Sequence, residues 1–478
     1  MPAHFGLSRD PETITLDRDR VLMGGSPLRL LRLAERAGSL VREWESGAAV
    51  GHRKAGQLLA RRLISSGLFL PRPGPTPFGP EDVTVVIPVR DRPELLQRVL
   101  TALKGLQCLV VDDASTDPRR TREIVDHAGA RFLPLAANSG PAAARNAGLG
   151  QVTTPLVAFV DSDCVPDPDW LEPLLGHFDD PLVAAVAPRI LPLQVVPSTA
   201  LSRYEAVRSS LDRGASGGLV RPLSRIPYVP SAALLVRREA AGDVLFDPQL
   251  RGGEDVDLVW RLVDAGWDVR YEPGSIVAHD GPTHLWSWLR RRAFYGTTAG
   301  PLARRHPAAL VPLQASAWSA GVWALVLARR PLLAAGLLTA SIGALAHRFD
   351  GFVEKPFGVA TKIAGAGTLR SALPALHGLA RAWSPALVLG LCWRRTRPGA
   401  AFALVAPALG DWRTDRAQLD PLRYAALHVA DDIAYGAGVW QGCATARTLA
   451  PLRPRLVFRA RIWSSTSLRT QLSDRRIG

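Results

Sequence analysis

From residue 83 onward, short apolar runs alternate with amphipathic stretches. The runs predict β-strands, and the stretches between them, whose apolar residues recur every three to four positions, predict helices. Strand, helix and strand at this spacing imply parallel pairing, so we expect an α/β fold with a doubly wound, mostly parallel sheet. Strands are expected at 83–89, 108–115, 131–135 and 156–160, and helices at 92–103, 120–129 and 140–150.

Two carboxylates mark the end of the strand expected at 156–160. Asp161 and Asp163 follow its apolar residues directly, before Pro166 and Pro168 break any regular pairing. Ligands of open α/β sheets bind at the strands' carboxyl ends, where alternate carboxylates can converge on a divalent cation that also grips a diphosphate. The chain has other Asp-x-Asp triplets, and only the position after a strand distinguishes this pair.

A second pair of acids, Asp112 and Asp113, ends the preceding long strand and belongs to the same sheet edge. Arg145, on the Ala-rich helix expected at 140–150, can reach a neighbouring carboxylate or a phosphate. A structural salt bridge is the alternative for Arg145. We therefore expect a nucleotide to bind over this edge of the sheet.

The segments on either side of the α/β pattern differ from it. Residues 1–72 contain short strand-like runs and two amphipathic stretches that each end at a glycine, which predicts a small winged-helix-like α+β module. It loosely resembles the peptide-recognition domains of modified-peptide pathways, and a plain structural cap is the alternative. Residues 73–82 have the Pro and Gly density of a linker. The α/β domain is expected at 83–300 and a mostly helical region at 301–478.

Two apolar stretches stand out in the C-terminal region. Residues 308–328 are uncharged for 21 positions, and 331–346 for 16, with Arg329 and Arg330 between them. The first is just long enough to cross a bilayer and the second is short. A re-entrant hairpin, an interfacial anchor and a buried hairpin all fit, and we favour membrane association.

Composition narrows the class of protein. The chain has 478 residues, 47% of them apolar, which excludes a disordered protein. It carries 58 basic against 43 acidic residues, a formal charge of +15, which favours anionic partners such as nucleotide phosphates or lipid headgroups, with a GC-rich genome as the alternative cause. No stretch has the pattern of a nucleic-acid-binding surface. The charged first twenty residues predict no signal peptide, and the four cysteines are scattered, so a cytoplasmic catalytic part is expected.

Five ordered motifs now support a resemblance. The runs VTVVIPVRDRPELL, VVDDASTD, ANSGPAAARNAGL, VAFVDSDCVPDPDWLE and GGEDVDLVWRLVDAGW, within residues 83–300, resemble the nucleotide-sugar-dependent family-2 glycosyltransferases of the GT-A fold. Further runs, LMGGSPLRLLRL, HRFDGFVEKPFG and HVADDIAYGAGVWQG, are similar to the mycofactocin-system glycosyltransferases of actinobacteria.

The resemblance implies roles for the acids and their neighbours. Asp163, aided by Asp161, would bind Mg²⁺ or Mn²⁺, with His279 as a third ligand. His284 competes for that third role, and either histidine can instead be structural. Asp113 would hydrogen-bond the uracil edge of the nucleotide. The residues implied in binding the nucleotide sugar are Pro88, Val89, Arg92, Asp112, Asp113, Arg145 and Asp161.

The catalytic base is expected where two glycines precede Glu254 and Asp255 at the start of a helix. The resemblance implies that Asp255 deprotonates the attacking hydroxyl and that Glu254 contacts the acceptor. A helix-capping role for these acids is the alternative. Asp257 and Arg261 are expected to be structural.

Two further segments bear on this site. Arg290–Arg292 could lie over the diphosphate, or on a solvated or membrane-facing helix. Ser231 and Ala232 stand where many relatives have a glycine, which leaves the geometry of the acceptor loop open.

The resemblance implies an inverting single displacement in which the enzyme supplies no nucleophile. The donor is expected to be UDP-glucose and the acceptor the peptide-derived redox carrier premycofactocin, with β-linked and repeated transfer at the cytoplasmic face of the membrane. A processive polysaccharide or lipid-linked sugar synthase is a second hypothesis, although its usual Q-x-x-R-W motif and longer spans are missing. A silent nucleotide- or peptide-binding scaffold is a third, which the presence of every proposed site acid disfavours.

Overall fold

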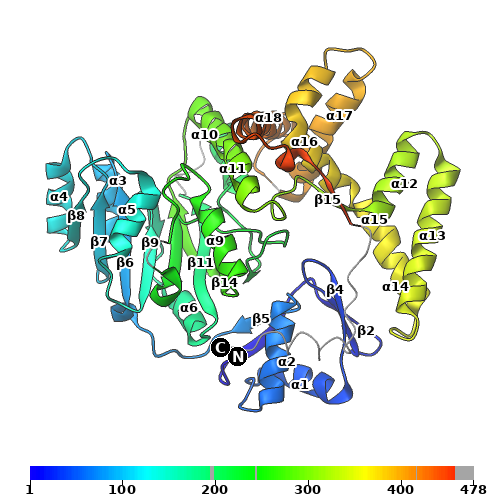
Figure 1. The fold of residues 1–478 in the computed structure, drawn as a ribbon, viewed down its shortest axis with the longest axis horizontal. Coiled ribbons are helices and arrows are strands. Elements are labelled where there is room, and N and C mark those ends of the chain that lie inside the picture. Colours follow the sequence, from blue (N-terminus) through cyan, green and yellow to red (C-terminus); the bar gives the residue numbers. More distant parts are fainter. Residues whose placement is uncertain (194–198, 243–244, 416, 458–478) are drawn as a thin grey trace.

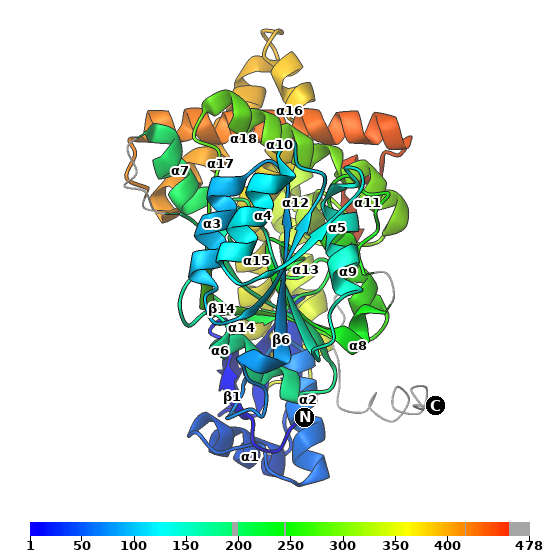
Figure 2. The same ribbon diagram turned by 90° about the vertical axis from the view of Figure 1, so that its left-hand side faces the viewer.

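The structure is a computed structural model that describes residues 1–193, 199–242, 245–415 and 417–457. A central β-sheet with helices on both faces forms one part, and the N-terminal residues form a small unit beside it (Figure 1). Helices of the C-terminal third lie against both (Figures 1 and 2). Residues 458–478 of the expected C-terminal region lie outside the described residues.

Within the described residues, nine strands form the central sheet. Its first half consists of β6 (Val83–Val89), β7 (Gln107–Asp112), β8 (Arg131–Pro134) and β9 (Leu156–Val160). All pairs among these four strands, β6 with β7, β6 with β9, and β7 with β8, are parallel. β6 and β9 coincide with the strands predicted at 83–89 and 156–160, so the predicted α/β sheet is confirmed here.

The second half of the sheet is mixed. It consists of β10 (Cys164–Pro166), β11 (Val183–Pro192), β12 (Gly218–Leu219), β13 (Ala233–Arg237) and β14 (Asp268–His279). β13 lies antiparallel between β9 and β11, whereas β11 and β14 are parallel. The strand order is β10-β14-β11-β13-β9-β6-β7-β8, with β12 paired to β14.

Helices cover both faces because strand residues alternate between two cores. The long flanking helices are α3 (Pro93–Ala102), α4 (Pro118–His127), α5 (Gly140–Leu149) and α9 (Glu254–Asp264). Val85 and Ile87 of β6 share a core with Leu96 of α3 and Val125 of α4. Val86, between them in sequence, belongs to the core that contains α5 and α9. Shorter helices are α6 (Glu172–Leu175), η2 (Gly176–Asp179), α7 (Ala200–Arg208) and α8 (Arg238–Ala241).

The N-terminal module contains both helices expected from its sequence pattern. β2, β3 and β4 form an antiparallel sheet, and β1 pairs antiparallel with β5, which ends at the start of the linker. A single 3₁₀ turn, η1 (Pro80–Asp82), precedes β6. The elements of the module are β1 (Gly6–Arg9), β2 (Ile14–Leu16), β3 (Val21–Gly24), β4 (Arg29–Arg32), α1 (Glu35–Glu45), α2 (Lys54–Ser65) and β5 (Phe69–Arg72).

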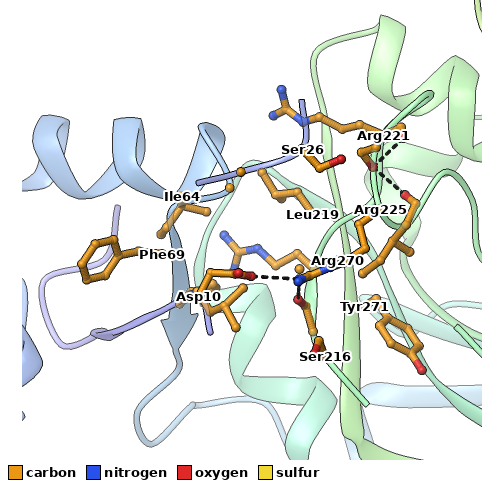
Figure 3. A pocket seen from close by; sticks show the side chains of 18 of the residues that line it. Asp10, Ser26, Ile64, Phe69, Ser216, Leu219, Arg221, Arg225, Arg270 and Tyr271 are labelled. Carbon is orange, nitrogen blue, oxygen red and sulfur yellow. Dashed lines mark hydrogen bonds and ion pairs between the residues drawn. The ribbon is translucent and has the colours of Figure 1, made fainter. Parts of the chain in front are cut away.

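Ion pairs hold this module against the sheet domain. Arg61 Nη2 lies 2.6 Å from Asp180 Oδ1, whose carboxylate is fully buried. Arg225 Nη2 lies 2.8 Å from Asp10 Oδ2 at the edge of a pocket of about 600 Å³ between the two parts (Figure 3). Residues from both parts line this pocket, among them Ser26, Phe69, Leu219 and Tyr271.

The module also contacts the C-terminal helices. Leu30 of β4 packs in one apolar cluster with Phe349. Arg32 Nη1 donates a hydrogen bond of 2.8 Å to the carbonyl oxygen of Gly351. The run HRFDGFVEKPFG, residues 347–358, is therefore an internal contact between the N-terminal and C-terminal parts.

The C-terminal third of the described chain is mostly helical. A parallel strand pair, β15 (Gln314–Ser316) with β16 (Arg455–Val457), ties its two ends together. A short π-helix, η3 (Thr361–Ala366), and a 3₁₀ turn, η4 (Ala450–Leu452), complete it. Its α-helices are α10 (Leu285–Thr297), α11 (Ala299–Arg305), α12 (Ala317–Leu327), α13 (Pro331–Phe349), α14 (Pro356–Ala360), α15 (Gly367–Arg370), α16 (Ala372–Gly390), α17 (Arg397–Asp415) and α18 (Pro421–Ala446).

The structure corrects the prediction for the apolar run 308–328. Its helix, α12, has 11 residues and is about 16 Å long, which is too short for a hydrocarbon core of about 30 Å. Residues 308–316 lie outside the helix, because part of this stretch lines a cavity and pairs as β15. Among the described helices, α13 alone is long and apolar enough to span a membrane, judged by length and composition.

Candidate active site

A cavity of about 1180 Å³ opens where β6, β7 and β9 end. It is bordered by strand ends, by the loop before α9 and by the C-terminal helices. The sequence-predicted residues on its wall are Pro88, Val89, Arg92, Asp113, Arg145, Asp161, Asp163, Glu254, Asp255 and His279. The tertiary structure therefore brings together side chains that are up to 191 positions apart in the sequence.

Arg145 links the two acid groups of the cavity. Its side chain is 4% exposed, and Nη2 lies 2.6 Å from Asp161 Oδ1. Its other terminal nitrogen, Nη1, lies 3.1 Å from Glu254 Oε1, and the guanidinium lies over the ring of Phe246. The buried cation thus ties the end of β9 to the start of α9, as the salt-bridge alternative for Arg145 expected.

Burial raises the pKa of Asp161 above its ordinary value, against the opposing effect of Arg145. The charges of Asp163 and Glu254 raise this pKa further. Around Arg145, the carboxylates of Asp161, Asp163 and Glu254 thus lie close enough to influence one another. Carboxylates gathered in this way can be stabilised by a bound cation.

Asp163 lies between a cation and an imidazole. Arg92 Nη1 lies 2.6 Å from its Oδ2, and His279 Nε2 lies 3.7 Å from its Oδ1. Burial lowers the pKa of His279, which favours the neutral imidazole that can bind a metal. His284 is exposed at the start of α10 and does not border the cavity, so His279 is the histidine that the fold places beside Asp163.

The donor set of Asp163 and His279 fits a divalent cation, since carboxylate oxygen and neutral imidazole both bind Mn²⁺ and the carboxylate suits Mg²⁺. Asp161 is turned toward Arg145, and its oxygen atoms do not gather with those two residues as closely as in a formed three-ligand site. Within the described parts of the chain, one set of three does gather within 4.8 Å, namely His377, Asp411 and His428.

That other cluster already contains a cation. Arg208 Nη1 lies 3.1 Å from Asp411 Oδ2, and His377 Nε2 lies 3.2 Å from Asp411 Oδ1. His428 Nε2 lies 3.1 Å from the same carboxylate. The group is thus a salt-bridge network that joins α7 to α16, α17 and α18.

Asp255, like Glu254 before it, borders the cavity at the start of α9. The backbone N–H of Val256 donates to Oδ1 over 2.8 Å, and that of Ser231 approaches Oδ2 at 3.4 Å. Burial, together with the charge of Glu254, raises the pKa of Asp255 from 3.8 to about 6. A carboxylate held in this way is poised near neutral pH, as a general base should be.

The glycine pair before α9 lies in close contact with α10 and α11. Gly253 has φ 77°, a left-handed conformation that favours glycine. A β-carbon at Gly252 would lie 2.8 Å from Phe294 Cζ, and one at Gly253 would lie 2.9 Å from Leu302 Cδ1. α10 and α11 therefore press on the loop that carries Glu254 and Asp255.

Two acids, Asp112 and Asp113, stand at the end of β7, and both accept hydrogen bonds that hold the fold. Asp113 accepts the backbone N–H groups of Ser139 at 2.7 Å and Gly140 at 2.8 Å, which anchors the start of α5. Asp112 is 1% exposed, accepts from Ser115, and does not reach the cavity wall. The structure thus places Asp113, but not Asp112, where it can touch a nucleotide.

The residues expected to be structural are so placed. Asp257 is 2% exposed and pairs with Arg261 at 2.7 Å and with His306 at 3.0 Å. The arginines at 290–292 divide: Arg291 borders the cavity, and Arg292 is buried against Glu205 at 2.6 Å.

Sequence reasoning missed a group of cavity residues. Tyr228, Tyr295, Arg381 and Tyr435 also line this cavity. They come from a loop, α10, α16 and α18, so no local spacing relates them. The run HVADDIAYGAGVWQG contains Tyr435, so its resemblance to related glycosyltransferases was the one sequence feature that pointed to this residue.

The mixed sheet, the paired acids at its strand ends and the acid-bearing helix beside them define a glycosyltransferase of the GT-A fold. The sequence pattern described as Glycosyl transferase family 2 matches residues 84–244. The chain belongs to this family. It is 41% identical over 473 residues to the pre-mycofactocin glycosyltransferase of Mycobacterium tuberculosis, a similarity that covers 95% of this chain and 98% of that protein.

Other similarities cover less. Glycosyltransferase AglE of Haloferax volcanii is 28% identical over 225 residues, covering 44% of this chain and 70% of that protein. The mannosyltransferase PcManGT of Pyrobaculum calidifontis, solved in complex with GDP-Man and Mn²⁺, is 20% identical with a TM-score of 0.37, covering 64% of this chain and 90% of that one.

Proposed function

We propose that this glycosyltransferase moves glucose from UDP-glucose to premycofactocin with inversion, forming a β-linkage, and that it repeats the transfer on its own product. The observation that carries this proposal is the cavity-facing Asp255, whose pKa is raised to about 6. The similarity to the pre-mycofactocin glycosyltransferase of Mycobacterium tuberculosis, which covers both chains almost completely, supports the acceptor.

Asp255 is the proposed base. Its carboxylate takes the proton of an acceptor hydroxyl while that oxygen attacks the anomeric carbon of the donor. The bond from the anomeric carbon to the diphosphate oxygen breaks, and its electron pair leaves with the diphosphate. Glu254, 3.1 Å from Arg145, is the proposed contact for the acceptor. One displacement inverts the configuration and needs no enzyme nucleophile.

The proposed cation site uses Asp163 and His279, with Asp161 beside them. A bound Mg²⁺ or Mn²⁺ there would offset the charge of the leaving diphosphate. Arg92, now 2.6 Å from Asp163, is positioned to move between this carboxylate and a phosphate. Asp161 itself stays with Arg145, which fixes the turn after β9.

The proposed nucleoside site is the other end of the cavity. Pro88 and Val89 offer the backbone at the end of β6, and Asp113 borders the same space. Because both oxygens of Asp113 accept N–H groups of α5, a contact to uracil would add to an existing anchor. Asp112, buried beneath it, contributes to this site only by supporting the strand end.

Purified protein tests this proposal directly. Incubation with premycofactocin, Mn²⁺ and either UDP-glucose, UDP-galactose or GDP-mannose, followed by mass spectrometry, reports donor and chain length together. We expect hexose additions with UDP-glucose, and NMR of the product should give the large anomeric coupling of a β-glucoside. A product with one of the other donors, or an α-linkage, would contradict the proposal. Nucleotide binding without any turnover would favour the scaffold hypothesis.

We also propose that the protein attaches to the cytoplasmic face of the membrane through helix ends. At the α12–α13 turn, Leu327 and Leu332 are 82% and 87% exposed beside Arg329 and Arg330. Trp393, 63% exposed, precedes further arginines at the α16–α17 turn. Exposed apolar side chains next to arginines suit an anionic lipid surface, at about 1 kcal/mol per arginine.

Vesicle flotation tests the attachment. The protein should float with vesicles containing phosphatidylglycerol and less with pure phosphatidylcholine. A Leu327→Asp, Leu332→Asp double variant should stay at the bottom of the gradient, whereas Leu422→Asp, at an 80% exposed position on α18, should not change flotation. Absence of flotation of the unaltered protein with anionic vesicles at low salt would refute the attachment.

A further inference from the structure

α18 approaches α10 and α11 unusually closely, and four glycines allow it. A β-carbon at Gly296 would overlap the carbonyl oxygen of Tyr435, and one at Gly438 would overlap that of Ala293. Gly300 and Gly442 meet in the same way one turn further along. Two glycines four residues apart on each side thus bring the helix backbones into contact. Figure 2 shows α18 running across the molecule against α10.

This contact explains the glycines of the run HVADDIAYGAGVWQG, residues 428–442, in physical terms. Its glycines press α18 against α10, which carries Phe294 over the loop before the catalytic acids. As a result Tyr435, one turn before Gly438, borders the catalytic cavity. α16 packs on the other side of α18 and contributes Arg381 to the same wall.

We call the part of the cavity lined by Tyr228, Tyr295, Arg381 and Tyr435 the tyrosine wall. It has side-chain groups that can still bind a ligand. Arg381 lies 4.0 Å above the centre of the Tyr435 ring, so the two form one stacked unit. Among the residues that the structure describes, the hydroxyls of Tyr228 and Tyr295 form no hydrogen bond. Burial raises the pKa of Tyr295, so its hydroxyl remains a neutral donor.

The charge of the tyrosine wall is already balanced. Asp432 is 3% exposed and lies 3.4 Å from Arg381, while Asp431 is 5% exposed and lies 3.2 Å from Arg292. Asp432 therefore matches Arg381 of the wall, and Asp431 and Glu205 match Arg292 behind it. Within the wall itself the one guanidinium, Arg381, is paired, so the wall offers a neutral ligand flat faces and hydrogen-bond donors.

We propose that the tyrosine wall is the acceptor subsite and that it binds a neutral ring, a pyranose or a phenol-type ring, through its flat face. The ring would lie against Tyr435 and Arg381, with a hydroxyl turned toward Asp255. This inference rests on the proposed function and adds the class of acceptor that the cavity selects. Because backbone contact fixes α18 relative to α10, the subsite keeps a constant position with respect to the base.

Two glucosides test the subsite. 4-Nitrophenyl β-D-glucopyranoside offers a planar aryl ring and a pyranose, and methyl β-D-glucopyranoside offers the pyranose alone. With UDP-glucose as donor, the ratio of transfer to donor hydrolysis should fall about tenfold in Tyr435→Ala for the aryl glucoside, because ring stacking contributes on this scale. Tyr435→Phe keeps the ring and should stay within about twofold of the unaltered protein.

Trp440→Ala is the matched control. Trp440 packs edge-on against Trp383 in the same α16–α18 interface and does not border the cavity. It should therefore lower the melting temperature without changing the ratio. An equal loss in both alanine variants, or no loss in Tyr435→Ala, would overturn the subsite.

Binding separates this inference from the proposed function. Saturation-transfer NMR of the aryl glucoside needs no turnover, and its signal should weaken in Tyr435→Ala but not in Trp440→Ala. If UDP-glucose is neither hydrolysed nor transferred while this binding difference persists, the proposed donor fails and the subsite stands. If UDP-glucose turns over and neither glucoside binds, the subsite fails and the donor stands.

Discussion

The raised pKa of Asp255 makes a prediction about both rate and stability. If the base must be ionised, its pKa of about 6 sets the acidic limb of the rate profile. At pH 5 about one tenth of the carboxyl is ionised with that pKa, against about nine tenths at the ordinary value. Transfer at pH 5 should thus fall about tenfold relative to pH 7.5, measured as kcat/KM for the acceptor at saturating donor.

The raised pKa of Asp255 also makes the free energy of unfolding depend on pH. The folded protein holds the Asp255 proton more tightly than the unfolded chain, so the contribution of this one group to stability is fully present below pH 3.8 and is lost as the pH rises through about 6. At neutral pH this loss is about 3 kcal/mol. Asp255→Asn should therefore abolish transfer, by at least about 100-fold, and raise the free energy of unfolding at pH 7.5.

Glu254 supplies the internal check, because its charge follows burial among the causes of the shift. Glu254→Gln should move the acidic limb to lower pH, even where it also weakens acceptor binding. Rates and urea unfolding would be measured on the same preparations from about pH 4.5 to 8.5. An acidic limb near pH 4 in the unaltered protein, or an Asp255→Asn variant that transfers normally, would refute the reasoning.

Three further outcomes are expected. Asp163→Ala should lose metal-dependent binding of UDP by about tenfold or more in calorimetry, and full activity of the unaltered protein in excess chelator would contradict the metal role. Gly438→Ala places a β-carbon on the Ala293 carbonyl oxygen and should lower the free energy of unfolding by about 1–3 kcal/mol. Gly399→Ala, at an open helical position, should stabilise the protein slightly. Equal melting temperatures of the two variants would count against the close contact. Burial is outweighed at Asp411 by its histidine and arginine partners, so its pKa is lowered; Asp411→Asn should cost about 1–3 kcal/mol at pH 7, a difference that shrinks as the pH falls below 3.8, and a pH-independent difference would contradict this.

The sequence by itself determined the parallel half of the sheet and the acids at its edge. β6 and β9 follow from uninterrupted apolar runs, and a run followed by acids places Asp161 and Asp163 at a strand end. The start of α9 likewise places Glu254 and Asp255 in a first helical turn. These features are local, because strand and helix periodicity are decided by neighbouring residues.

Only the tertiary structure decided what those acids meet. The pairing of Arg145 with Asp161 and Glu254, and the burial that raises the pKa of Asp255, arise between elements far apart in the chain. Contacts between distant elements also decide that α12 is shorter than the apolar run 308–328 and that four separate segments form the tyrosine wall. Tyr435 reaches the cavity because glycines on two helices let backbones touch, and whether two such patterns face each other depends on long-range packing that no local period encodes.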